Sequence, residues 1–253
     1  MIFNFFRKRP YKLTNNLSKM NQTNSDFAFN DQYNLIEKIG KLNKQLNILD
    51  LGANEGKISQ KYGELFSNLC VYAFEPFPES YTKLKEISKV KSYIRPYKIA
   101  ISNFIGTQTL YCNVNNETNS LFPSNFITPE IDNLTKSVNS IKVKTITIDE
   151  FFYTKKLDSI DILKMDIQGS ELLALQGAVQ CLKQDKIAII YTEVEFISIY
   201  KNQPLFLEIA NYLNSQNYII YGLYNLNYIN NQLAWCDAIF INKNIFNDEV
   251  LIK

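Results

Sequence analysis

The chain has 253 residues, 46% of them hydrophobic, which is enough for one large domain with a sizeable core. Its 27 Lys and Arg against 25 Asp and Glu give a net charge of +2, so no broad basic surface is expected and a nucleic-acid partner is disfavoured. The sequence contains no histidine, which removes the commonest general base and zinc ligand and disfavours most hydrolase and zinc-enzyme mechanisms.

The N-terminal segment, residues 1–30, is rich in Asn, Ser, Thr and Lys and lacks periodicity, so it is predicted to be a flexible arm before a single domain over 31–253. Its first ten residues carry three phenylalanines followed by Arg7, Lys8 and Arg9. This apolar run is too short for a signal peptide or a spanning helix. Peripheral contact with an anionic membrane and a frayed or core-docked terminus both explain it.

After the arm, apolar strand-like runs alternate with amphipathic runs of helical period. This pattern predicts an α/β fold, with a doubly wound and mainly parallel seven-stranded sheet. One half has expected strands at 46–51, 70–75 and 97–101 and helices at 55–66 and 78–88. The other half has expected strands at 160–166, 186–195, 218–221 and 238–242 and helices at 170–179 and 205–213.

Between the two halves, residues 106–113 and 141–144 alternate like the strands of an antiparallel hairpin insertion. The Asn-rich and Ser-rich segment that joins them is too long for a plain connection, so a lid or substrate loop is predicted there. Thr147 and Glu150 have the spacing of a capping box, which predicts the start of a short helix.

The four cysteines have no CxxC spacing, and most lie in or beside apolar runs: Cys70, Cys112, Cys181 and Cys236. They are expected to be buried and reduced, which favours a cytoplasmic location.

The first chemical motif runs from Asp50 to Gly56, where a buried strand enters a glycine-containing turn and then a helix. Such a turn is expected to present backbone N–H groups to a ligand, with Gly52 and Gly56 permitting close approach and Ala53 and Asn54 in the same cofactor-binding turn. The dinucleotide fingerprint GxGxxG is absent, and Asp50 would repel a pyrophosphate. The motif therefore favours a cofactor that carries positive charge.

Glu75 ends the second predicted strand, where an acidic side chain can accept hydrogen bonds from both hydroxyls of a ribose. Pro76, which follows it, and Ala100, in the third predicted strand, are assigned to the same cofactor-binding set. Asp166, at the end of the strand over 160–166, completes that set as a partner for the amino group of a cofactor or for a substrate hydroxyl.

The strand over 160–166 also carries Lys164 in an otherwise apolar run, and an unpaired buried ammonium is so costly that Lys164 is expected to pair with a carboxylate or reach the surface. Glu171 follows at the start of the next predicted helix, as a substrate ligand or as a partner of the helix dipole. Glu193 and Glu195 end the strand over 186–195 at the same edge of the sheet.

Five segments follow one another along the chain: Asp50-Leu-Gly-Ala-Asn-Glu-Gly56, Phe74-Glu-Pro-Phe-Pro78, Val143-Lys-Thr-Ile-Thr-Ile-Asp-Glu-Phe151, Leu163-Lys-Met-Asp-Ile-Gln-Gly-Ser-Glu171 with Leu175-Gln-Gly-Ala178, and Asp237-Ala-Ile-Phe-Ile-Asn242. In this order, over about residues 47–242, the chain resembles the FkbM family of class I methyltransferases. The resemblance implies S-adenosylmethionine as cofactor and O-methylation of a sugar, glycan or polyketide-like small molecule, as in polysaccharide biosynthesis. Gln168 departs from the pattern, because an acid is expected at that position.

Under this interpretation catalysis rests mainly on positioning, which can lower the activation free energy by about 7–11 kcal/mol. A general base contributes less, because its rate enhancement is typically about 10²- to 10⁴-fold. The candidate catalytic residues are Lys164, Asp166, Glu171 and Glu193, with Glu195 as a further candidate base. A magnesium ion held by Asp166 and a second acid is a weaker alternative, and no metal ligands are assigned.

Two other functions fit parts of the same pattern. A nicotinamide-dependent oxidoreductase would use the same strand, turn and Glu75, but the third glycine and a Tyr-x-x-x-Lys pair are missing. A catalytically degenerate methyltransferase fold that serves as a binding protein is favoured only by Gln168.

Overall fold

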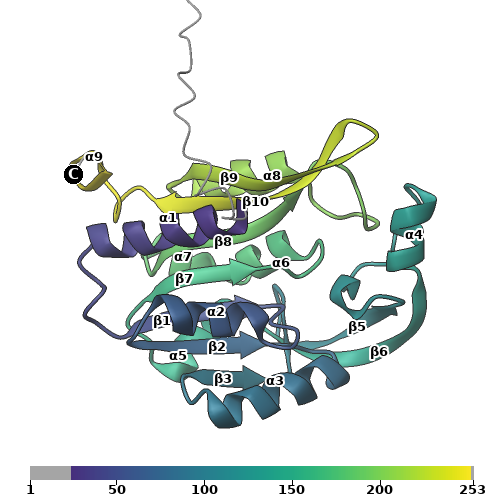
Figure 1. Cartoon of the computed structure of the whole chain (residues 1–253), viewed down its shortest axis with the longest axis horizontal. Coiled ribbons are helices and arrows are strands. Elements are labelled where there is room, and N and C mark those ends of the chain that lie inside the picture. Colours follow the sequence, from purple (N-terminus) through teal and green to yellow (C-terminus); the bar gives the residue numbers. More distant parts are fainter. Residues whose placement is uncertain (1–23, 252–253) are drawn as a thin grey trace, which may run out of the picture.

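The computed structural model describes residues 24–251 and shows a twisted sheet between two layers of helices (Figure 1). The sheet has seven strands: β1 (Leu46–Leu51), β2 (Leu69–Phe74), β3 (Ile94–Tyr97), β7 (Ile160–Met165), β8 (Ile187–Glu195), β9 (Tyr218–Ile229) and β10 (Gln232–Asn242). The predicted doubly wound α/β class is confirmed.

The strand order is β3-β2-β1-β7-β8-β10-β9, and every neighbouring pair is parallel except those made by β10, which runs antiparallel to β8 and β9. The chain passes from β1 outward through β2 and β3 and then returns to β7 on the other side of β1. Ligands of open α/β sheets bind at such a reversal, beyond the carboxyl ends of the strands. Asp50 of β1 and Lys164 of β7 are direct partners in the register at this point.

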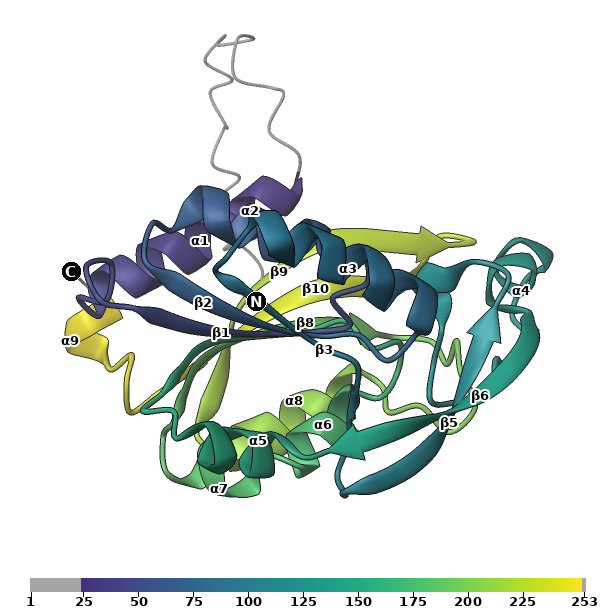
Figure 2. The same cartoon turned by 90° about the horizontal axis from the view of Figure 1, so that it is seen from below.

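Helices cover both faces of the sheet (Figure 2). On one face lie α1 (Asn24–Lys38), α2 (Lys57–Leu65) and α3 (Pro78–Val90), and on the other lie α5 (Ile148–Lys155), α6 (Glu171–Gln176), α7 (Val179–Lys183) and α8 (Phe206–Ser215). Each face has its own apolar core, so the central strands are buried on both sides and read as continuous apolar runs. The short α9 (Asp248–Leu251) follows β10.

The predicted arm over 1–30 is wrong at its C-terminal end, because α1 begins at Asn24. Its apolar residues are few and are interspersed with Asn, Asp and Gln, which hid the helix from a search for periodicity. Tertiary burial compensates, since Ala28, Phe29, Leu35 and Ile36 pack into the core over β9 and α2. Residues 1–23, including the proposed membrane-contacting segment, lie outside the described residues.

The predicted third strand over 97–101 is also wrong, because it is divided between two sheets. Ile94–Tyr97 forms β3 at the edge of the main sheet, where Pro96 is tolerated. Ala100–Ile101 forms β4, which pairs with the second sheet instead.

The second sheet contains β4, β5 (Gly106–Asn113) and β6 (Ser137–Ile146), in the order β4-β6-β5. The segment between β5 and β6 forms the 3₁₀ helix η1 (Asn116–Thr118) and the helix α4 (Pro129–Thr135). β5 and β6 pair antiparallel, as predicted for the hairpin insertion. Together these elements form a lobe beside the carboxyl ends of β1, β2 and β7 (Figure 1).

Two predicted helix features are changed by local hydrogen bonds. Thr147 caps α5 by accepting from the Glu150 N–H, but the Glu150 carboxylate accepts from Thr154, so the reciprocal half of the capping box is missing. The predicted helix over 170–179 ends at Gln176, and α7 begins separately at Val179, where the Asp149 carboxylate accepts from the first backbone N–H groups.

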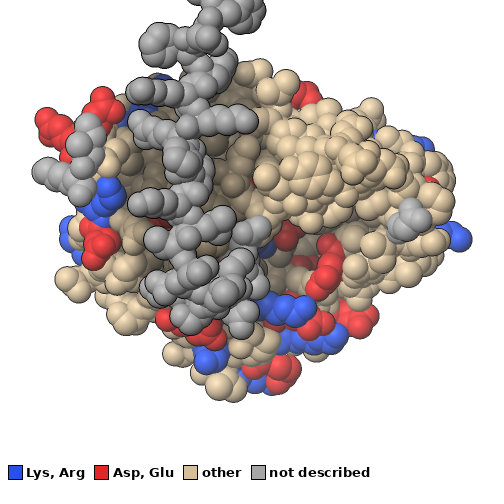
Figure 3. All heavy atoms as spheres, turned by 45° about the horizontal axis from the view of Figure 1, so that its top comes forward, with Lys and Arg blue, Asp and Glu red and all other residues tan. Residues whose placement is uncertain are grey.

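The closing strands are longer than predicted, and β9 and β10 form an extended hairpin with little charge. Residues 209–236 contain no Asp, Glu, Lys or Arg, and the surface over this hairpin is correspondingly uncharged (Figure 3). All four cysteines are free and buried, as predicted. Among the described residues, no helix is long and apolar enough to cross a membrane.

The packing of α1 predicts a large loss of stability in Phe29→Ala. The Phe29 ring is 3% exposed and meets the rings of Tyr62 and Tyr191 edge-on, and deleting such a ring costs about 3–5 kcal/mol. Urea unfolding should show this decrease, whereas Phe27→Ala, at a half-exposed position of the same helix, should change the free energy of unfolding by under about 0.5 kcal/mol. Equal effects of the two variants would contradict the packing of α1.

Candidate functional site

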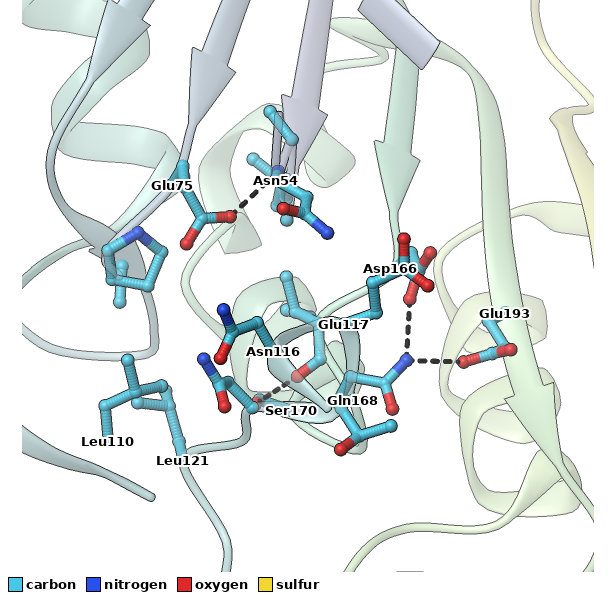
Figure 4. A pocket seen from close by; sticks show the side chains of 18 of the residues that line it. Asn54, Glu75, Leu110, Asn116, Glu117, Leu121, Asp166, Gln168, Ser170 and Glu193 are labelled. Carbon is cyan, nitrogen blue, oxygen red and sulfur yellow. Dashed lines mark hydrogen bonds between the residues drawn. The ribbon is translucent and has the colours of Figure 1, made fainter. Parts of the chain in front are cut away.

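A cavity of about 470 Å³ lies beyond the carboxyl ends of β1, β2, β7 and β8, and the insertion between β5 and β6 closes its far side (Figure 4). This volume is typical of small-molecule sites. Most residues assigned from the sequence line it: Gly52, Ala53, Asn54, Glu75, Pro76, Ala100, Lys164, Asp166 and Glu193. Asp50, Gly56 and Glu171 do not.

The turn after β1 requires glycine at its first position. Gly52 has φ +71°, and a Cβ there would lie 1.9 Å from the backbone oxygen of Asp166. This close approach brings the ends of β1 and β7 together beneath the cavity.

The N–H groups of this turn are not presented to a ligand as the sequence predicted. Those of Gly52 and Ala53 donate to the Phe74 carbonyl, that of Asn54 donates to Glu75, and that of Gly56 donates to the Ala53 carbonyl. A pyrophosphate needs such donors free. The geometry therefore disfavours a dinucleotide more strongly than the missing glycine did.

Asp50 does not contact the cavity, which corrects its assignment as a direct cofactor ligand. Its side chain is fully buried, with one oxygen 3.1 Å from the Lys164 ammonium and the other accepting from Ser59 at 2.6 Å. Lys164 also donates to the carbonyls of Leu51 and Gly52 at 3.3 and 3.1 Å. The expected pairing of Lys164 is confirmed.

The Lys164 ammonium keeps its charge in this environment. Burial alone lowers its pKa, but attraction to Asp50 and Asp166 outweighs burial, so the pKa lies above its ordinary value. An ammonium that is already bonded to a carboxylate and two carbonyls has little capacity left for a proton-transfer role. Its observed contacts instead hold the end of β1 and the turn after it against β7.

Glu75 lies on the cavity wall at the end of β2 and is 7% exposed. One oxygen accepts from the Asn54 N–H and the other from the Phe77 N–H, both at 2.8 Å, which fixes the carboxylate and leaves further lone pairs for a ligand (Figure 4). Burial raises the pKa of Glu75 to about 7, against the lowering effect of these two bonds.

Across the cavity, the Gln168 amide joins two carboxylates (Figure 4). Its Nε2 donates to Asp166 at 2.8 Å and to Glu193 at 3.0 Å. Its Oε1 lies 2.7 Å from the hydroxyl of Tyr200, and its carbonyl accepts from Ser120 of the insertion. The sequence marked Gln168 only as a missing acid and did not reveal this bridge.

Asp166 and Glu193 differ in their exposure. The Asp166 side chain is 46% exposed to the cavity, and its second oxygen lies 4.0 Å from the Lys164 ammonium. Glu193 is partly buried, and burial together with repulsion from Asp166 and Glu195 raises its pKa well above the ordinary value. Asp166 is therefore the more accessible of the two carboxylates to a substrate.

Glu171 and Glu195 lie behind the cavity wall, so the structure does not place Glu171 as a substrate ligand. Glu171 is fully buried, and one oxygen accepts from the Ile167 N–H. Burial raises its pKa to about 7. Burial and repulsion from Glu171 raise the pKa of Glu195 well above its ordinary value.

Several cavity residues were missed because they lie far away in sequence or in irregular segments. Asn116 and Glu117 come from η1, Tyr200 from the loop after β8, and Trp235 from β10. The Asn-rich and Ser-rich segment was predicted to be a substrate loop, which covers Asn116 and Glu117, but no prediction covered Tyr200 or Trp235. Lys57 of α2 pairs with Glu117 at 3.2 Å across exposed surface.

Among the described residues, no group of three or more Asp, Glu, Cys or His side chains is arranged to hold a metal ion. Asp166 and Glu193 come nearest to such an arrangement, and the Gln168 amide stands between them. The weaker magnesium alternative thus gains no ligand set from the described part of the chain.

Known proteins resemble this chain in sequence and in fold. Residues 50–220 match the family model described as the methyltransferase FkbM domain. A protein of Sinorhizobium fredii (strain NBRC 101917 / NGR234) described as 2-O-methyltransferase NoeI is 26% identical over 162 residues, which are 62% of this chain and 66% of that protein. The chain thus spans just under two thirds of that relative's length.

Among solved structures, the methyltransferase FkbM from Methylobacillus flagellatus KT superposes with a TM-score of 0.51 at 18% identity. The match covers 77% of this chain and 43% of that one. At this identity the superposition supports the fold alone.

The buried ion pair predicts a strong effect of Asp50→Ala on stability. The variant leaves the Lys164 ammonium in the core without its carboxylate, and breaking one partner of a buried pair costs about 3–5 kcal/mol. Denaturant unfolding should detect this loss, while Lys57→Ala, which breaks the exposed pair with Glu117, should cost under about 1 kcal/mol.

The double variant Asp50→Leu with Lys164→Met serves as the matched control, because it removes both charges and should recover stability relative to Asp50→Ala. An Asp50→Ala protein as stable as the unmodified chain would contradict the proposed role of the pair.

Proposed function

The chain belongs to the FkbM family of methyltransferases, and on that premise we propose that it transfers a methyl group from S-adenosylmethionine to a hydroxyl of an uncharged sugar, glycan or related small molecule. The observation that carries this proposal is the arrangement of Glu75 and Asp166 on opposite sides of one cavity at the switch point of the sheet. Glu75 is suited to a nucleoside, and Asp166 faces the space left for an acceptor.

The residues present fit the cofactor. The fixed Glu75 carboxylate can accept both hydroxyls of a ribose, and apolar side chains beside it, Ile99, Ala100, Ile101 and Leu110, provide a wall for a base. The cationic amino group would meet the half-exposed Asp166. When bound, S-adenosylmethionine supplies an electrophilic methyl group on a positively charged sulfur.

The charges of the cavity favour an acceptor without anionic groups. The lysines that line it, Lys57 and Lys164, are already paired with Glu117 and Asp50. A phosphate or carboxylate on the acceptor would find no unpaired lysine among the described lining residues and would face Asp166 instead. Asn116 and Trp235 offer the hydrogen bonds and the apolar ring face that a neutral sugar can use.

Asp166 is the residue to which we assign the acceptor proton. One of its oxygens is held by Gln168, so the other, 4.0 Å from the Lys164 ammonium, is free to accept a hydrogen bond from the acceptor hydroxyl. In methyl transfer the proton of that hydroxyl would pass to this Asp166 oxygen.

A measurement of methyl transfer distinguishes this proposal from the alternative of a binding protein without catalysis. Such a protein would bind the cofactor and methylate no acceptor. The description of the Sinorhizobium fredii relative as a 2-O-methyltransferase favours transfer to oxygen. The two carboxylates at the cavity, those of Asp166 and Glu193, favour catalysis over a purely binding role.

Glu75→Ala should abolish micromolar binding of S-adenosylmethionine and S-adenosylhomocysteine in isothermal titration calorimetry, because the ribose loses its fixed acceptor. Glu79→Ala, an exposed change on α3, is the control and should bind normally. No binding by the folded unmodified chain would overturn the proposed cofactor.

The same titrations should depend on pH. Because the pKa of Glu75 in the free protein is raised to about 7, the carboxyl is protonated below that pH and must lose its proton to accept both hydroxyls. Affinity should therefore fall as pH decreases from 7.5 to 6, by at most tenfold per unit. In Glu75→Gln this pH dependence should disappear, and a dependence unchanged in that variant would assign it to another group.

Asp166→Asn should lower the rate of methyl transfer by about 10²- to 10⁴-fold, the usual contribution of a general base. Transfer is measured as formation of S-adenosylhomocysteine with an acceptor found by screening neutral glycans. Because Asp166 would also meet the cofactor's amino group, transfer is measured at saturating S-adenosylmethionine, so that weaker cofactor binding does not account for the loss of rate. Full activity in Asp166→Asn would remove Asp166 from its assigned role.

A further inference from the structure

A neutral amide joins the two cavity carboxylates. A single nitrogen, Nε2 of Gln168, lies 2.8 Å from an Asp166 oxygen and 3.0 Å from a Glu193 oxygen. Each of its two N–H bonds serves one carboxylate, so the donor capacity of the amide is fully used. The lysine beside this bridge, Lys164, is bonded to Asp50 and lies 4.0 Å from Asp166.

The orientation of the Gln168 amide is fixed from several sides. The Tyr200 hydroxyl lies 2.7 Å from Oε1 and 2.9 Å from the Thr118 carbonyl, and its single proton can serve only one of these two oxygens. The two carboxylates therefore decide which end of the amide faces them. The backbone of Gln168 is held in the left-handed region at φ +54°, and Ser120 donates to its carbonyl. A flipped amide would aim its oxygen at both carboxylates, which is strongly unfavourable.

From these contacts we propose that Gln168 is a positioning residue whose side-chain amide takes the bridging role that a divalent cation would otherwise have, so that Asp166 and Glu193 are held together at the cavity by two hydrogen bonds. The amide supplies two donors in two fixed directions and adds no net charge. A glutamate at the same position would put a third carboxylate within about 3 Å of the other two, as judged from the Nε2 distances.

Three such carboxylates must be neutralised, either by shared protons or by a cation. An all-oxygen set of this kind suits a hard divalent ion such as Mg²⁺ or Mn²⁺. A Mg²⁺ ion lies about 2.0–2.1 Å from its oxygen ligands, closer than Nε2 lies to these carboxylate oxygens at 2.8 and 3.0 Å. The half-exposed Asp166 side chain has the freedom to close that difference. One substitution should therefore turn the amide bridge into a metal site.

The role of Gln168 in catalysis rests on the proposed methyl transfer. Its role in place of a metal ion does not, because metal binding is measured without an acceptor. The experiment is a Mn²⁺ titration of the full chain, followed by electron paramagnetic resonance of the free ion and by thermal unfolding. Unmodified protein, Gln168→Glu and Gln168→Glu with Glu193→Gln are compared. Gln232→Glu adds the same charge at an exposed position of β10 and is the matched control.

We expect Gln168→Glu to bind one Mn²⁺ at least tenfold more tightly than the unmodified chain and to unfold at a higher temperature when Mn²⁺ is present. Adding Glu193→Gln should remove both gains, and Gln232→Glu should show neither. Titration of each variant with S-adenosylhomocysteine reports separately on the fold and on the proposed cofactor, so failure of one proposal is distinguishable from failure of the other.

Two results would overturn the inference. A Gln168→Glu protein that gains neither affinity for Mn²⁺ nor Mn²⁺-dependent stability would show that the amide does not stand in a cation's place. Unmodified protein can be tested even if the variant fails to fold, because submillimolar Mn²⁺ should leave the nuclear magnetic resonance signals of Asp166 and the Gln168 amide unbroadened. Selective broadening of these signals would mean that a cation displaces the bridge.

Discussion

A single buried ion pair, between Lys164 and Asp50, joins the two halves of the sheet where the site is formed. The two residues are register partners on β7 and β1, the strands on either side of the switch point. Lys164 also bonds the carbonyls at the end of β1, next to the turn at Gly52. Charge, register and turn geometry therefore fix the floor of the cavity together, and the ligand-facing residues are placed relative to it.

From this floor the site extends in two directions. Glu75 is fixed through the N–H of Asn54, in the turn that the ion pair holds, and Asp166 follows two residues after Lys164. Gln168 then ties Asp166 to Glu193 of β8, and Ser120 ties the insertion to Gln168. A connected series of polar contacts therefore surrounds the cavity, next to the two apolar cores.

The sequence predicted the central strands well because their burial on both faces leaves uninterrupted apolar runs. β1 was placed with its observed bounds, and the prediction gave α2, β2, α3, β5, β7 and β8 in their observed order. Prediction was poorer where tertiary contacts override local pattern. α1 has a weak periodicity but a buried Phe29, and the chain after Tyr97 leaves the main sheet to pair with β6.

The same contrast holds for the site. Residues that end strands, such as Glu75 and Asp166, could be placed at the cavity because parallel strands end at one edge. The sequence predicted that a buried Lys164 must be paired, and its contact with Asp50 confirms this. It did not predict that the partner is Asp50, which therefore does not contact the cavity. The bridge at Gln168 depends on Tyr200 and Glu193, and no local pattern links these three residues.

The most direct test of the central claim is a crystal structure of the chain with S-adenosylhomocysteine. The account predicts the ribose hydroxyls on the Glu75 carboxylate, the base against the apolar wall near Ala100, and the pair of Lys164 and Asp50 intact beneath the ligand. A ligand bound elsewhere, or a structure in which Asp50 leaves Lys164 to contact the ligand, would contradict it.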